Sequence, residues 1–299
     1  MKYKMCIWYL LLSIMTMTTT LKAQTLDNAR NAYFHRDYQQ VKNLIKKLKA
    51  EKPKDKLLMA EIALLTIATD IHNDVDDAED ALEDLLENNP DNASLHYMGS
   101  ILWSHYAQNA SFFSKMSAYK SHIAALIKAA ELEPENERYQ YGAASAYGQP
   151  SMMGGDSDKQ KPIVDQLMVN NSAFAQMAMM DYLQNTQDKE NGFIFIEEVA
   201  IAFKENIEVL ERAAQLLWTF DKKQQAGELF TAVCLLTPGE FEAFVKWGDA
   251  CLLSASFVLD GTLEQEDGLI SIDRLIKYTF VSDEGSRYAL SVRDKLLAQ

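Results

Sequence analysis

The chain has 299 residues, of which 48% are hydrophobic, and a formal net charge of −14. Nucleic acids and anionic lipid surfaces are bound through clusters of Lys and Arg, so this excess of acids argues against both as partners. Only 12 glycines and 6 prolines are present, which favours helices joined by short turns over a loop-rich fold.

Residues 1–23 predict an export signal. Lys2 and Lys4 give a basic start, an apolar run follows, and Ala23 supplies a small residue for cleavage. The run is shorter than the about 20 residues that span a bilayer, which favours cleavage over an uncleaved membrane anchor. Cys6 lies too early to be a lipoprotein cysteine. We therefore expect a periplasmic or secreted protein with no transmembrane span after signal removal.

Beyond the signal, apolar residues recur with a helical period, and prolines follow several of these stretches, where a helix must stop. The expected helical segments, in chain order, are a pair within 25–50, a pair ending before Pro90, Ala93–Ala107, Met116–Leu132, Glu137–Tyr147, a helix from Ser157 with Pro162 in its first turn, a helix from Asn171, Lys189–Lys204, a pair within 207–238, a helix from Phe241, and stretches over 264–279 and 283–298.

The pair within 207–238 sets the register for the others. Against the 34-residue template W-x2-L-G-x2-Y…A-x3-F…P, its matching positions are Leu210, Ala213, Ala214, Leu217, Ala226, Phe230 and Pro238. The template's residue sizes are kept although several letters differ. Over most of residues 25–258 the chain resembles the tetratricopeptide repeat (TPR) superfamily. The resemblance implies an all-α superhelix of about six or seven hairpins, closed by capping helices over 259–299.

Two features of the pattern call for separate predictions. His122 occupies a slot that the template gives to a small residue, which predicts a shifted or splayed helix pair. Cys234 and Cys251 lie at different distances from the turn near Pro238, so we expect two buried small residues instead of a disulfide, although exported proteins can form disulfides.

The segment from Gly148 to Asp156 is the most irregular beyond the signal, and its adjacent glycines permit positive φ. Its P-x3-G-G-D pattern is similar to a turn in exported bacterial TPR-like proteins, including the T component associated with TRAP-type transporters. This resemblance implies an alternative function, a small-molecule-binding accessory or carrier protein of a solute transport system. That alternative requires an enclosed apolar pocket near Tyr147, Met152 and Met153.

Signals of catalysis are missing from the sequence. The five histidines have no metal-site spacing, Gly154-Gly155 lacks a phosphate-loop ending, and no nucleophile elbow is present. The acidic run from Asp70 to Asp91 fails the EF-hand pattern and is interpreted as a solvated helix face, with weak calcium or a basic partner as the alternative. We expect no enzymatic activity, no cofactor and no metal.

The TPR resemblance also implies a concave groove, lined by the first helix of each hairpin, that binds a protein or peptide segment. In four successive units, the position directly after the template's tyrosine is an aromatic residue. These residues are Trp103, Tyr147, Tyr182 and Trp218. Large aromatic side chains bury much area at low entropic cost, so we predict that these four form a binding column. The alternative is that the four rings fill space between neighbouring hairpins.

Overall fold

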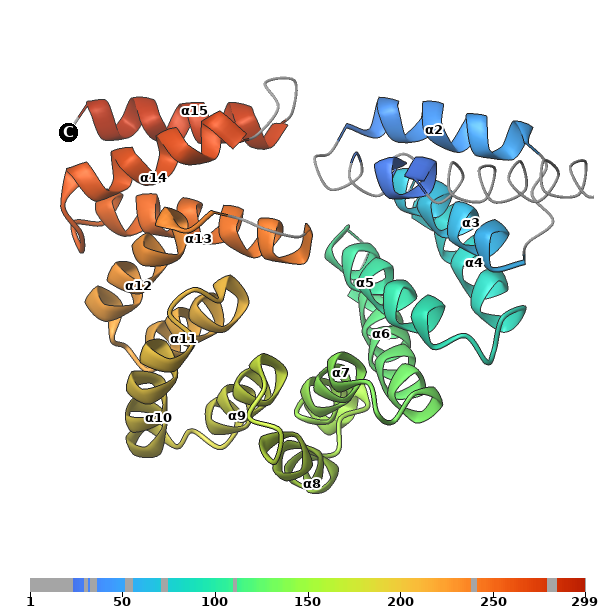
Figure 1. Ribbon diagram of the computed structural model, residues 1–299, viewed down its shortest axis with the longest axis horizontal. Helices are drawn as coiled ribbons and strands as arrows, with labels where there is room; N and C mark the ends of the chain where they lie inside the picture. Colours follow the sequence, from blue (N-terminus) through green and yellow to red (C-terminus); the bar gives the residue numbers. More distant parts are fainter. Residues whose placement is uncertain are drawn as a thin grey trace, which may run out of the picture. The chain divides into compact units, whose positions relative to one another are not determined.

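The computed structural model describes residues 24–29, 32, 37–51, 56–70, 75–109, 112–237, 241–278 and 284–298 (Figure 1). Their helices are α2 (Tyr38–Ala50), α3 (Lys56–Asp70), α4 (Val75–Glu87), α5 (Ala93–Asn109), α6 (Phe112–Leu132), α7 (Glu137–Tyr147), the short 3-10 helix η1 (Ser151–Met153), α8 (Ser157–Met168), α9 (Ala173–Asn185), α10 (Lys189–Ala202), α11 (Ile207–Thr219), α12 (Lys223–Leu235), α13 (Phe241–Leu259), α14 (Gln265–Tyr278) and α15 (Glu284–Leu297). No strand occurs in these ranges. The prediction of an all-α fold of packed helices is confirmed.

The chain divides into two compact units, residues 1–90 and 91–299. In the first unit, α3 packs against both α2 and α4. The apolar face of α2, formed by Val41, Ile45 and Leu48, is buried against Ile62 and Leu65 of α3. The predicted boundaries of the signal segment and of the capping helices stay predictions.

In the second unit each helix from α5 to α15 packs against the next, and a second set of contacts joins alternate helices. Helix α9 packs on α7 and α11, and α13 packs on α11 and α15. Figure 1 shows that α7, α9 and α11 lie on the inner side of the curved stack, with α8, α10 and α12 outside them. The alternation follows from the hairpin repeat, because every second helix occupies the same layer.

Small residues at the template positions allow this close packing. Ala143, Ala178, Ala213 and Ala214 are all fully or almost fully buried where inner helices meet. Phe230 of α12 supplies the large apolar side chain of its hairpin and is fully buried. The alternation of small and large side chains therefore lets neighbouring helices interlock at native density.

The turns between helices use polar residues that tolerate a left-handed backbone. Asn171 before α9 and Asp221 before α12 have φ values of 49° and 63°. The side chain of Ser172 accepts a hydrogen bond from the backbone N–H of Ala175, which caps the start of α9. Side-chain caps of this kind also begin α2, α10 and α11.

Two local predictions are wrong, and one alternative of a third is excluded. Helix α6 begins at Phe112, because the expected connection before Met116 is largely helical. Pro162 lies in the second turn of α8 instead of the first. Helices α5 and α6 are not splayed but pack closely. His122 fits between them because a ring nitrogen lies 2.7 Å from the carbonyl oxygen of the buried Ser100.

Among the described residues, no helix combines the length and the apolar character needed to cross a membrane.

Candidate functional site

The four predicted aromatic residues lie in different surroundings. Trp103 of α5 is 2% exposed and packs edge-on against Tyr106, with ring centroids 5.9 Å apart. A side chain with so little accessible surface cannot meet a partner without rearrangement of the helix pair. Trp103 therefore has the setting that the packing alternative describes.

Tyr147 of α7 and Tyr182 of α9 both lie next to α8 and are partly buried. The ammonium group of Lys159 is 5.4 Å from the ring centroid of Tyr147, and that of Lys161 is 5.6 Å from the centroid of Tyr182. Each lysine covers one ring face in a cation–π contact. The structure thus brings these two tyrosines to one helix, and their contact with a partner stays a prediction.

Trp218, at the end of α11, is the most exposed of the four, at 44%. Its ring packs edge-on against Phe257 of α13, with centroids 5.5 Å apart, and Phe257 in turn stacks on Phe230. One part of the indole therefore supports the junction of α11 and α13, while the rest is open to solvent.

A polar cluster that the sequence did not predict crosses the inner helices. We call it the charged seam; its members are Asp181 and Gln184 of α9, Glu211, Arg212 and Gln215 of α11, and Lys246 of α13. Consecutive inner helices are joined through it. The sequence signal for the seam is Asp181, which occupies the slot of the template's tyrosine.

Arg212 is the centre of the α9–α11 half of the seam. Its guanidinium group donates hydrogen bonds to the carboxylate of Asp181 and to the side-chain oxygen of Gln184. The side chains of Arg212 and Asp181 are only 12% and 11% exposed. Burial lowers the pKa of Arg212, but Asp181, Tyr141 and Glu211 together outweigh this effect, so the pKa is raised and the group stays charged.

Glu211 joins α11 to α13. Its side chain is 1% exposed; it accepts a hydrogen bond from Gln215, and its Oε2 lies 3.2 Å from Nζ of Lys246, which is 41% exposed. Burial raises the pKa of Glu211 above its ordinary value, and the nearby Lys246 opposes this shift. The seam therefore runs from a desolvated interior to a cation at the surface.

Tyr141 extends the polar surroundings toward α7. Burial and the negative charge of Asp181 raise the pKa of Tyr141 well above its ordinary value, so its hydroxyl stays protonated. Its ring lies 6.1 Å from the ring of Phe174, whose other neighbour is the guanidinium of Arg138 at 5.4 Å. The inner layer thus combines aromatic faces with hydrogen-bonding groups.

The P-x3-G-G-D turn forms a rigid link between α7 and α8. Gly154 has a φ of 104°, and a Cβ at Gly155 would lie 1.7 Å from the carbonyl oxygen of Gln149, so both positions require glycine. The amide of Asp156 donates to the carbonyl of Tyr147 at 2.9 Å, which closes the turn. Met152 is 68% exposed and so does not line an enclosed pocket of the kind that a carrier requires.

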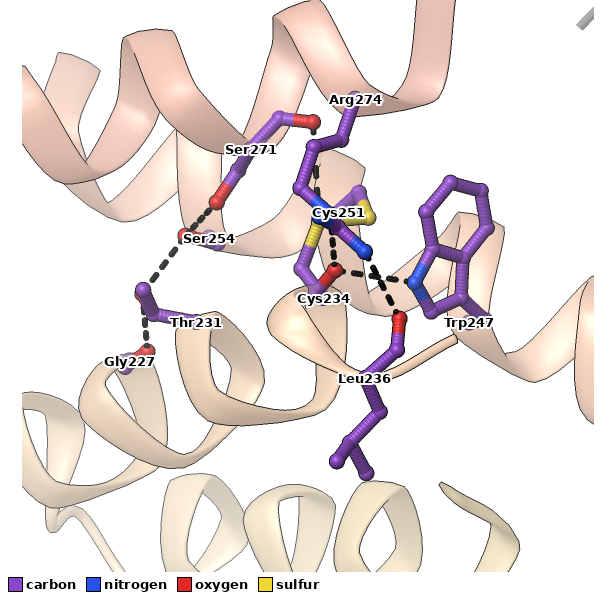
Figure 2. Close-up of a disulfide and its surroundings, with 9 residues drawn as sticks. All are labelled: Gly227, Thr231, Cys234, Leu236, Trp247, Cys251, Ser254, Ser271 and Arg274. Carbon is purple, nitrogen blue, oxygen red and sulfur yellow. Dashed lines mark hydrogen bonds between the residues drawn. A yellow bond between two sulfur atoms is a disulfide. The ribbon is translucent and has the colours of Figure 1, made fainter. Parts of the chain in front are cut away.

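A disulfide joins Cys234 of α12 to Cys251 of α13, contrary to the prediction of two unlinked cysteines (Figure 2). Both are fully buried, as expected. The prediction failed because Trp247 and Cys251, one turn apart on α13, both lie against the end of α12. The indole N–H of Trp247 donates to the carbonyl of Cys234 at 3.0 Å.

Side chains from α14 complete this part of the unit, which we call the disulfide corner. Arg274 donates to the carbonyl oxygens of Cys234 and Leu236, at 2.8 and 3.0 Å. The hydroxyl of Ser254 on α13 lies 2.7 Å from that of Thr231 and 2.9 Å from that of Ser271, as Figure 2 shows. A covalent bond and neutral or backbone-directed hydrogen bonds therefore hold α12, α13 and α14 together.

Among the described residues, no three His, Cys, Asp or Glu side chains lie close enough together to hold a metal ion. His122 has a lowered pKa because it is buried, and its ring is engaged with the Ser100 carbonyl.

No protein-family model matches the chain, and no curated protein matches its sequence. Among solved structures, the crystal structure of NprR in complex with its cognate peptide NprX is similar. It is 17% identical, with a TM-score of 0.39, and the match covers 93% of this chain and 85% of that chain.

Proposed function

We propose that this chain is an exported, non-catalytic scaffold that binds a protein or peptide segment along the inner helices α9, α11 and α13. The charged seam is the observation that carries the proposal. It presents Gln184, Gln215 and Lys246 at partly accessible positions on three successive inner helices. Amide and ammonium groups at helix-to-helix spacing suit the carbonyl and amide groups of a peptide backbone.

The buried half of the seam supports this function by fixing the positions of the accessible groups. Arg212 holds the Gln184 side chain by a hydrogen bond, and Glu211 holds those of Gln215 and Lys246. Groups that are already oriented lose less conformational freedom on binding. Trp218, exposed at the end of α11, would supply the apolar anchor that polar contacts alone do not give.

Export is supported by two independent features. The first is the basic and then apolar pattern of residues 1–23 with Ala23 at its end. The second is the Cys234–Cys251 disulfide, because structural disulfides form and persist mainly in oxidising compartments such as the periplasm and the cell exterior. The exposure of Met152 at the surface favours this function over that of a small-molecule carrier.

The test is a selection of random peptides on residues 24–299, followed by fluorescence anisotropy with the enriched peptide. Trp218→Ala and Lys246→Gln should each weaken binding about tenfold or more, as loss of a central contact does. The matched controls are Ile201→Ala in the last turn of α10 and Lys204→Gln in the turn after it, both at exposed positions of the outer layer. Binding that is insensitive to the first pair, or lost only with the controls, would contradict the proposal.

A further inference from the structure

The first unit separates its charges by helix. Helix α2 carries Lys42, Lys46, Lys47 and Lys49 and no acid. Helix α4 carries no basic residue, and its acids are Asp76, Asp77, Glu79, Asp80, Glu83, Asp84 and Glu87. Helix α3, between them, is mostly apolar. A basic helix is unusual in a chain whose net charge is −14.

The three helices line a groove that is open to solvent. Helix α3 packs on both α2 and α4, but α2 and α4 do not pack closely on each other. The cavity between them measures ≈ 540 Å³. Its floor is α3, through Met59, Ala63 and Thr66, and its lining includes Lys49 of α2 and Ala81 of α4. Met59 is 53% exposed.

The groove continues along the basic helix. A second cavity of ≈ 270 Å³ shares Lys49 and Thr66 with the first and is also lined by Lys42 and Lys46. The groove thus has an apolar floor, a wall of lysines on one side and the acidic helix on the other.

Several of the flanking charges lack a neutralising neighbour. Lys46 and Lys49 on α2, and Asp80 and Asp84 on α4, are exposed and form no ion pair within the described part of the chain. Asp80 and Asp84 are four residues apart on one helix face, where like charges repel. A surface with opposite charges on its two sides would relieve this repulsion on both walls at once.

The chain itself has such a surface. We propose that a second copy of this chain binds here, so that two copies form a symmetric dimer through their α2–α3–α4 surfaces. When two copies meet face to face about a two-fold axis parallel to α3, α3 lies over α3 of the partner and each α2 lies over the partner's α4. A two-fold axis that lies in the plane of the interface but perpendicular to α3 would place α2 over the partner's α2 and α4 over the partner's α4. Like charges would then face each other, so only the first arrangement is attractive.

The exposed apolar floor fits this arrangement. The twofold axis passes over α3, so Met59 and Ala63 of each copy would face those of the partner across the joined grooves, with the charged walls as a rim. Interfaces of this type place apolar contacts centrally and charges at the periphery.

The experiment measures the mass of residues 24–299 by sedimentation velocity over a range of concentrations. The wild-type chain should reach twice the monomer mass, with an apparent Kd that weakens about tenfold or more between about 0.05 and 0.5 M salt, because rim charges are screened. Two charge-reversed chains are compared with it, Lys46→Glu with Lys49→Glu, and Asp80→Lys with Asp84→Lys. All four positions are exposed in helices, where Lys and Glu have similar helix propensity.

Each reversed chain should be monomeric, since the exchanged charges of one wall then meet exposed charges of the same sign on the facing wall of the partner. An equimolar mixture of the two should dimerise, because each wall again faces its opposite. Circular dichroism establishes that both variants are folded; if one is not, the single changes Lys46→Glu and Asp84→Lys replace the double ones. A wild-type chain that is monomeric at every concentration, or a dimer that survives in both reversed chains, would overturn the proposal. Peptide binding on the inner helices of the other unit is measured separately and does not depend on this result.

Discussion

The charged seam and the disulfide corner both join neighbouring hairpins of residues 91–299, but they do so by different chemistry. In the seam, Asp181, Arg212 and Glu211 are taken out of water, and their mutual attraction must offset a large desolvation cost. In the corner, Cys234 and Cys251 are linked covalently, and the surrounding contacts are hydrogen bonds of hydroxyl and carbonyl groups. The stability of the seam therefore depends on the protonation states of its side chains, whereas the stability of the corner depends on the redox state of its two cysteines.

The largest expected effect is the loss of Arg212. Arg212→Ala should reduce the free energy of unfolding by about 3–5 kcal/mol, because it leaves the carboxylate of Asp181 buried without its cation. Urea denaturation at pH 7 measures the change. The control is the double variant Asp181→Asn with Arg212→Met, which removes both charges and should recover most of the loss. A loss below about 1 kcal/mol in the single variant would show that the seam is solvated.

Removal of the disulfide should have the next largest effect. The cysteines are 17 residues apart, and closing a loop of that size stabilises the folded chain by about 3 kcal/mol. Cys234→Ala with Cys251→Ala should show this loss in urea denaturation, and reduction of the wild-type chain should reproduce it. Between pH 5 and pH 8 the loss should stay constant, since neither alanine nor the disulfide titrates. If the loss in the free energy of unfolding changed with pH, the corner would depend on protonation as the seam does, which would contradict this prediction.

The smallest effect, and the one that separates the two junctions most directly, concerns Glu211. Its pKa in the folded state is raised above the ordinary 4.5, so the folded chain retains a proton that the unfolded chain has released. The free energy of unfolding contributed by this group therefore falls as the pH rises from 4.5 through the raised pKa. Glu211→Gln removes that dependence.

Urea denaturation of wild type and Glu211→Gln from pH 4 to pH 8 tests the sign. Relative to the variant, the wild type should become less stable as the pH rises through this range. Glu198→Gln, at an exposed position of α10, is the matched control for the substitution itself. A wild type that gains stability over the variant with rising pH would contradict the assignment of burial as the dominant cause.

The sequence predicted the hairpins well because helix packing depends on residue size at a fixed period. Leu210, Ala213, Ala214 and Leu217 lie in the core at the positions that the template gives, and Phe230 fills the second helix. Such a pattern is local, since each helix shows its buried face within its own turns.

The site was less predictable because its contacts join residues far apart in the chain. Asp181 and Arg212 are separated by 31 positions, and nothing local to either residue indicates the other. The register placed Trp103 on the expected helix but did not identify Tyr106 and the neighbouring helix that bury it. The cysteine pair was missed for a similar reason, since distance from a turn does not determine how α13 crosses the end of α12.

The two side chains that converge on the last turn of α12 have a consequence for the order of folding. The carbonyl of Cys234 receives donors from Trp247 and Arg274, and the carbonyl of Leu236 is also bound by Arg274, 38 positions later. During synthesis or export, therefore, α12 can start to fold as soon as it emerges. The carbonyl groups of its final turn receive all of these hydrogen bonds only after α14 has emerged. A chain that stopped at residue 258 would leave that turn unfinished, so the C-terminal helices complete the preceding hairpin as well as covering it.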